Sequence, residues 1–110
     1  MHWKCSVCNL IWDGAELPEK CPKCSNPPEK FQQLSDEQWK LVEMSRFTNS
    51  LHIELLTILP RLQEIAQQGL EDDLDPPCVT LFQRLLDDAV FLEKSVKAEL
   101  NGHMNRGKWG

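Results

Sequence analysis

The sequence predicts a small metal-bound module of short β hairpins and loops at residues 1–34. An all-α helical hairpin at residues 35–101 and a flexible tail at residues 102–110 follow it. Two closely spaced C-x-x-C pairs near the start of the chain predict the module. Apolar residues take up a three- and four-residue spacing only after Leu34, and an acidic loop with two prolines, residues 71–77, divides this helical part in two.

The module depends on Cys5, Cys8, Cys21 and Cys24, with twelve residues between the two pairs. Each C-x-x-C pair places two sulfurs on one tight turn, whose backbone N–H groups can point at them. Two such turns can bring four thiolates to one tetrahedral metal, and this ligand set indicates zinc or iron. A segment of this size buries too little apolar surface to fold alone, so we expect the metal to supply its folding energy.

Two disulfides are the alternative reading of these cysteines. The sequence opens Met1-His2-Trp3, without the charged and apolar regions of a signal peptide. We therefore expect a cytoplasmic protein, and disulfides are scarce in the cytosol.

The residues around the cysteines carry a further pattern. Trp3 lies two positions before the first cysteine, Gly14 lies midway between the pairs, and the second pair has the form P-x-x-C-P-x-C with Phe31 seven residues beyond it. Over about the first third of the chain this pattern resembles the rubredoxin-like domain, in the short form found in rubrerythrins. The resemblance implies one iron per chain, held by the four cysteines and cycling between Fe2+ and Fe3+, with zinc as the alternative metal. We expect Trp3, Trp12 and Phe31 to surround the metal centre.

Two positions depart from the family pattern, which usually has glycine directly after each cysteine pair. This chain has Asn9 and Ser25 there. The family geometry requires a positive φ at these positions, which Asn tolerates better than other non-glycine residues and Ser tolerates less well. We therefore expect an intact first cysteine turn and a slightly strained second one.

Composition and motifs limit the function. The net charge of −5 argues against nucleic-acid binding, and no apolar run is long enough to span a membrane. No G-x-S-x-G motif or phosphate loop is present, and a metal with four cysteine ligands has no open position for a substrate. We therefore expect an electron carrier that serves a redox partner protein, and no enzyme. A structural zinc-knuckle scaffold, or a non-catalytic subunit of a larger complex, is the alternative.

The residues Ser35-Asp36-Glu37-Gln38 read as a capping box that starts the first helix. Pro60 should kink this helix, and Gly69 should end it. The second helix should run from about Pro77 to Gly102. The expected apolar stripes are Trp39, Val42, Phe47, Leu51, Leu55, Ile58, Leu59, Leu62 and Ile65 in the first helix, and Cys78, Phe82, Leu85, Ala89, Leu92, Val96 and Leu100 in the second.

Further apolar residues widen these stripes beyond what one partner helix can cover; they are Leu56, Leu81, Leu86, Val90 and Phe91. Two hairpins that pair into a four-helix bundle would bury them, so we expect a homodimer. The alternatives are a metal module that covers this face, or a monomer whose surplus apolar residues are scattered over its surface.

Three isolated residues need separate interpretations. His52 has no Glu three residues before it, and Glu54 lies on another face of the helix, so no di-iron site is expected and His52 should be polar-facing or partly buried. Cys78 opens the second helix, where a thiol pKa can fall, but its place on the apolar stripe favours core packing over a redox role. Trp109 is either a docking residue or part of a disordered end.

Overall fold

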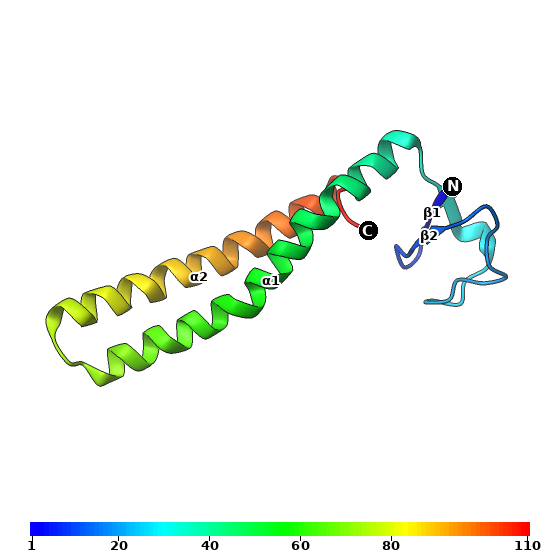
Figure 1. The fold of residues 1–110 in the computed structure, drawn as a ribbon. Coiled ribbons are helices and arrows are strands. Elements are labelled where there is room, and N and C mark those ends of the chain that lie inside the picture. The colour runs from blue at the N-terminus through cyan, green and yellow to red at the C-terminus, as the bar shows by residue number, and fades with distance from the viewer. The chain divides into compact units, whose positions relative to one another are not determined.

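The computed structural model describes all 110 residues and forms two compact units. The first is Met1–Arg46 together with Gly107–Gly110, and the second is Phe47–Arg106. In chain order the elements are β1 (His2–Cys5), β2 (Ile11–Asp13), the 3₁₀ turn η1 (Pro28–Lys30), β3 (Phe31–Gln33), α1 (Asp36–Asp72) and α2 (Pro76–Asn105). The predicted fold class, a small four-cysteine β module followed by a helical hairpin, is confirmed (Figure 1).

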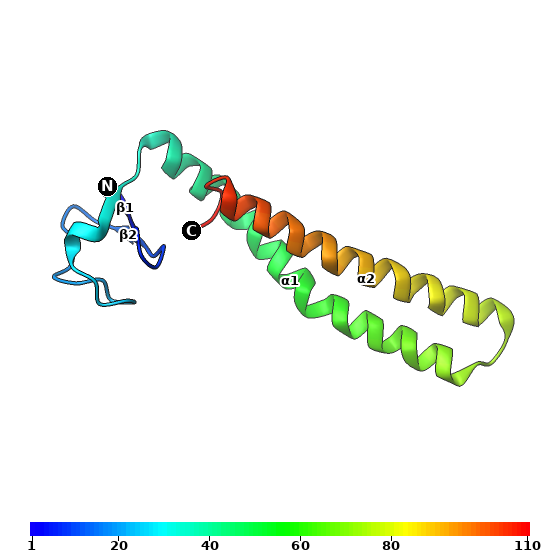
Figure 2. The ribbon, with the colours of Figure 1, turned by 180° about the vertical axis from the view of Figure 1, so that it is seen from behind.

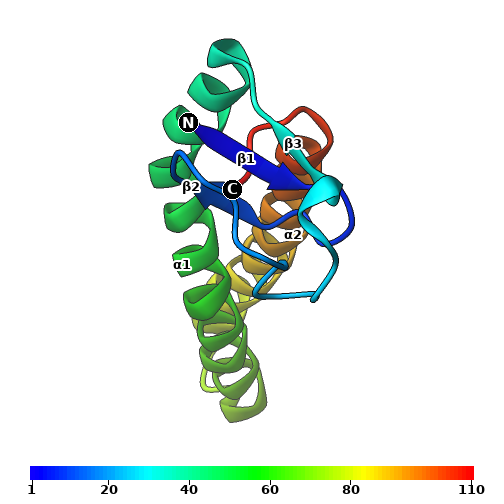
Figure 3. The same cartoon turned by 90° about the vertical axis from the view of Figure 1, so that its right-hand side faces the viewer.

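The module is built on a three-stranded antiparallel sheet with β1 in the centre and the order β2-β1-β3 (Figure 3). In this register Cys5, at the end of β1, lies opposite Phe31. Cys5 and Cys21 are fully buried and Phe31 is 6% exposed, so the two cysteines and this ring form the core of the module. Trp3 and Trp12 pack against that core, as predicted.

A capping box begins α1, as the sequence predicts. The Gln38 backbone N–H donates to Ser35 Oγ at 3.1 Å, and the Ser35 N–H donates to Gln38 Oε1 at 2.8 Å. One turn later the Trp39 ring stacks on His2 of β1, with ring centroids 3.6 Å apart. This stacking explains why the start of α1 belongs to the first unit, although the predicted boundary lies at residue 35.

The end of α1 differs from the prediction. The helix continues past Gly69 to Asp72, and Asp73 adopts the left-handed conformation (φ 49°) that terminates it. A side chain at position 69 would overlap the Phe82 ring of α2. Gly69 therefore permits close approach of the two helices and does not cap the first.

The second helix is longer than predicted at its end. Asp75 caps its start, because the Asp75 carboxylate accepts the Cys78 N–H at 2.9 Å. The helix runs to Asn105 and so includes residues 102–105 of the predicted tail. Of the remaining residues, Gly110 packs in the first unit, where its carbonyl accepts a hydrogen bond from Arg46 Nε at 2.8 Å.

Within the second unit, α1 and α2 lie antiparallel and side by side (Figures 1 and 2). The α1 helix is continuous through Pro60, and its ribbon bends in its central part (Figure 1). Neither helix has a stretch long and apolar enough to cross a membrane.

The face of α1 that packs on α2 shares only part of the predicted stripe. The buried and half-buried positions of α1 in this unit lie along one side of the helix; they are Asn49, His52, Leu56, Leu59, Leu62, Gln63, Ala66, Gly69 and Leu70. Asn49 bonds to His103 and Gln63 bonds to Glu93, so polar pairs cross the seam. Leu59 and Leu62 of the expected stripe lie on this face, whereas Phe47, Leu51, Leu55, Ile58 and Ile65 are exposed. Small residues let the two helices approach closely, and polar residues form hydrogen bonds across the seam. The spacing of the hydrophobic residues alone did not predict this arrangement.

Gly69→Ala tests the close approach of the helices. In an open helix this change adds about 1 kcal/mol of stability, because alanine is the better helix former. Here we expect a loss of about 1–3 kcal/mol, because the new methyl group overlaps Phe82. Urea unfolding followed by helical circular dichroism measures the difference.

Gly102→Ala is the matched control, because a side chain there meets only the flexible Arg106 guanidinium, at 3.2 Å. This variant should be neutral or stabilised. Equal stabilisation of both variants would contradict the packing described for Gly69.

Candidate metal centre

The structure brings the four predicted cysteines together. All four Sγ atoms lie within 4.8 Å of one another, with Cys5 and Cys24 3.7 Å apart and Cys8 and Cys21 3.6 Å apart. A tetrahedral ion with metal–sulfur bonds of about 2.3 Å requires sulfurs about 3.8 Å apart. The spacing therefore fits a four-thiolate metal site. All the cysteines are free thiols, so the disulfide alternative is not realised.

The first cysteine turn is closed by two backbone hydrogen bonds. The Asn9 N–H donates to the Cys5 carbonyl, and the Cys5 N–H donates to the Leu10 carbonyl, each at 2.9 Å. Asn9 adopts φ 66°, the positive value that the sequence predicts. This conformation lets the chain reverse immediately after Cys8, so that the Leu10 N–H points back at the Cys8 sulfur.

The second turn repeats this arrangement. The Ser25 N–H donates to the Cys21 carbonyl, and the Cys21 N–H donates to the Asn26 carbonyl, each at 2.8 Å. Ser25 has φ 63°, which also agrees with the prediction. Because serine has a Cβ and no special preference for this region, the second turn carries backbone strain that the first largely avoids.

Asn26 distinguishes the two turns chemically. Its side-chain Nδ2 donates to Cys24 Sγ at 3.3 Å, and its backbone N–H points at the same sulfur. Together these donors lower the pKa of Cys24 to about 6. At Cys8 the single backbone donor, Leu10, also lowers the thiol pKa, but burial and the three neighbouring thiols outweigh it and raise the pKa to about 11.

The sequence reasoning did not identify Asn26 as part of the site. The signal was present, because an asparagine two residues after the last cysteine can turn its amide back toward the chain. The extra side-chain donor makes the second turn the better stabiliser of negative charge on sulfur.

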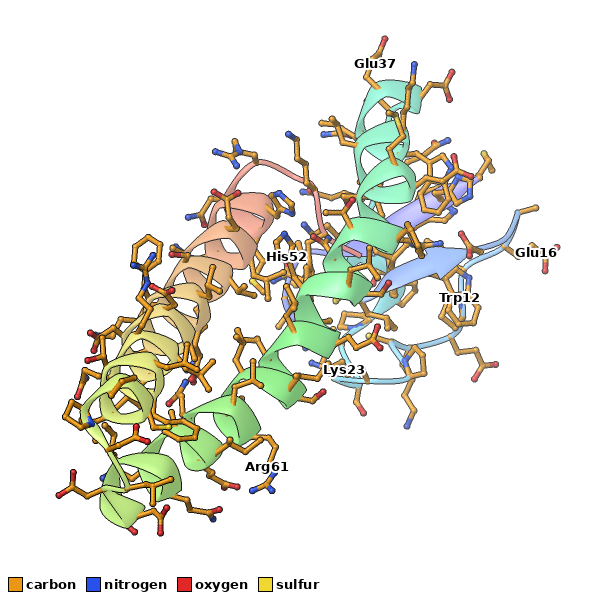
Figure 4. The ribbon with its side chains drawn as sticks, turned by 60° about the vertical axis from the view of Figure 1, so that its left-hand side comes forward. Trp12, Glu16, Lys23, Glu37, His52 and Arg61 are labelled. Atoms are coloured by element: carbon orange, nitrogen blue, oxygen red, sulfur yellow. The ribbon has the colours of Figure 1, made fainter.

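The site has one buried and one accessible side. Cys5 and Cys21, the first cysteine of each turn, are fully buried, whereas Cys8 and Cys24 are half-buried. Two indoles hold the loop between the turns: Trp3 Nε1 donates to the Gly14 carbonyl at 3.2 Å, and Trp12 Nε1 donates to the Glu16 carbonyl at 3.1 Å. Figure 4 shows Trp12 and Glu16 close together.

The other singled-out residues do not join this cluster. Cys78 is half-buried in the first turn of α2, where its hydrogen bond to the Asp75 carboxylate and burial raise the pKa of its thiol. His52 projects from α1 toward α2 and meets the His103 ring edge-on, with centroids 6.1 Å apart (Figure 4). No second group of three or more His, Cys, Asp and Glu side chains converges in the chain.

Ser25→Gly tests the strain in the second turn. Removing the Cβ at φ 63° recovers about 1–2 kcal/mol, and glycine flexibility costs about 0.5–1 kcal/mol, so we expect a small net gain in stability. The urea midpoint for release of the bound metal measures the effect. Ser6→Gly, in the first turn but without a positive φ, should lower that midpoint, and a fall in both variants would show that Ser25 is not strained.

Comparison with known proteins agrees with this geometry. Residues 3–32 match the family model described as the rubredoxin-like domain of rubrerythrin. A rubrerythrin from Clostridium perfringens is 53% identical over 34 residues, which are 31% of this chain and 17% of that protein. Reverse rubrerythrin-1 from Clostridium acetobutylicum is 46% identical over 35 residues, which are 32% of this chain and 19% of that protein.

The matched segment thus spans less than a fifth of either relative. No solved structure matches the chain. The family match and the four converging cysteines cover the same part of the molecule. Residues 3–32 are a rubredoxin-like domain of the rubrerythrin type, and its four cysteines form a metal-binding site.

Proposed function

We propose that this protein is a cytoplasmic electron carrier whose cysteine module holds one iron ion and passes single electrons to a partner oxidoreductase. The observation that carries the proposal is the convergence of four thiols at tetrahedral spacing, with N–H donors directed at Cys8 and Cys24. An iron ion bound there would supply one-electron exchange between Fe2+ and Fe3+.

The residues of the module suit such a role. The four cysteines fill every position of a tetrahedral shell, so the site favours electron exchange over substrate binding. The backbone bonds that close each turn fix the sulfurs, so they need to move little when the charge changes. Phe31 and Trp3 cover the inner side, while the half-buried Cys8 and Cys24 leave a short path to the surface.

A structural zinc site is the second candidate. It is favoured by the make-up of the module core, which consists of Cys5, Cys21 and one aromatic ring. A metal is needed to hold such a core together, whichever metal is bound. In that case the module would be a scaffold and the protein a subunit that binds others without redox chemistry.

The relatives are named rubrerythrins, and they match only the module. The helical part of this chain therefore needs its own explanation. Residues 35–100 hold thirteen acidic and six basic side chains, and this surface would suit a redox partner with a basic docking face.

The metal content of protein purified from its native cell tests the proposal. We expect one iron per chain, strong visible absorption in the oxidised state, and a reversible one-electron couple. Cys21→Ser should abolish metal binding, because it removes a buried ligand, whereas Cys78→Ser should leave the metal and the colour unchanged. Colourless protein with stoichiometric zinc would favour the scaffold role and overturn the proposal of an electron carrier.

Asn26→Ala tests whether this residue tunes the site. Hydrogen bonds to sulfur stabilise the more negative, reduced state, so losing the Nδ2 donor should lower the reduction potential by on the order of tens of millivolts. Protein-film voltammetry of the iron form measures the shift. Asn9→Gly is the control, because it removes an asparagine side chain from the first turn that donates to no sulfur. It should leave the potential nearly unchanged, whereas an equal shift in both variants would contradict a specific role for the Asn26 amide.

A further inference from the structure

The outer face of α1 carries an apolar stripe that nothing in the chain covers. Phe47 is 73% exposed, Ile58 is 47% exposed and Ile65 is 37% exposed, and Leu51 and Leu55 between them are also exposed. These residues recur at three- and four-residue steps, so they form one continuous line along the helix. The line is more hydrophobic than the seam against α2, which contains Asn49, His52 and Gln63.

Exposed apolar residues of α2 extend this surface. Leu81 is 67% exposed and Leu92 is 48% exposed. At 100° per residue, both lie to the same rotational side of their helix's inner seam as the outer stripe of α1 does. In an antiparallel pair, rotation in the same sense places the two sets on one side of the hairpin; the stripe of α1 together with Leu81 and Leu92 is its apolar face.

Charged residues on the edge of the stripe point to the occupant of this face. Glu54 and Arg61 lie on the edge of the stripe away from α2, seven residues or two helical turns apart. The Glu54 carboxylate has no ion-pair partner in the chain, and Arg61 contacts only Glu64 of the same helix, at 3.2 Å. Figure 4 shows Arg61 pointing away from α2.

We propose that a second copy of this chain covers the apolar face, with the two α1 helices packed antiparallel about a twofold axis near Thr57 and Ile58. Residues on the same edge face one another in an antiparallel helix pair. With the axis at this place, Glu54 of each copy lies opposite Arg61 of its partner. The contact is isologous, so this ion pair forms twice.

The stripe is self-complementary about the same axis. Leu51 and Leu55 lie on one side of it, Ile65 lies on the other, and Ile58 lies beside it. Two hairpins joined in this way form a four-helix bundle, which gives both apolar faces a partner of the same kind. The proposal does not depend on which metal the module binds, so its failure would leave the proposed function untouched.

Sedimentation velocity on the full, metal-loaded chain tests the proposal. The wild-type protein should be a dimer at micromolar concentration. Leu55→Glu should be a monomer with unchanged metal content, because the charge would be buried in the contact. A wild-type monomer at this concentration would overturn the proposal, as would a dimer that Leu55→Glu leaves intact.

Charge reversal tests the antiparallel arrangement. Glu54→Arg alone and Arg61→Glu alone each place like charges opposite one another twice, so each should weaken the dimer by roughly tenfold. The double variant Glu54→Arg/Arg61→Glu restores opposite charges at both places and should recover most of the wild-type dimer affinity. In a parallel dimer, or with an unrelated partner protein, the double change would give no recovery.

Lys94→Glu is the matched control, because it reverses an exposed charge on α2 and changes the net charge as Arg61→Glu does. It should leave the dimer affinity unchanged. Equal weakening by Lys94→Glu, or the absence of recovery in the double variant, would overturn the proposed pairing of Glu54 with Arg61.

Discussion

The module is organised around one requirement, that four sulfurs lie within bonding distance of a single ion. Its sheet has only three short strands, and its most buried side chains are two of the cysteines themselves. The backbone reverses sharply after each pair because a sulfur must meet its neighbour across the site and an N–H group must point at it. The positive φ values at Asn9 and Ser25 follow from that reversal.

The same requirement explains why the backbones of the two turns are nearly equivalent, although their side chains differ. Equivalent hydrogen bonds close both turns, since the metal geometry is the same for each. Only the second turn adds a side-chain donor, Asn26, and only there is a thiol pKa lowered to about 6. Negative charge on the sulfurs is therefore stabilised unevenly, most strongly at Cys24.

The helical hairpin is held together by contacts between two helices, not by a metal. Its seam is partly polar, with Gly69 against Phe82 and Asn49 bonded to His103, and several large apolar residues of α1 take no part in it. Those residues lie on the outer face of α1. A hairpin that leaves a line of large apolar residues exposed is suited to further association, and this separates its role from that of the module.

The sequence by itself determined the module, because its constraints are local. C-x-x-C spacing, the residues after each pair and the capping box at Ser35 act within a few positions, so the ligands, the turn conformations and the start of α1 could all be predicted. The ends of the helices and the seam between them depended on contacts between distant residues. The sequence alone makes Gly69 a helix terminator and the whole apolar stripe of α1 a core. The structure instead packs Gly69 against Phe82 and builds a partly polar seam that uses only part of the stripe. Spacing shows that a helix has an apolar side, and only the tertiary packing decides which side another helix covers.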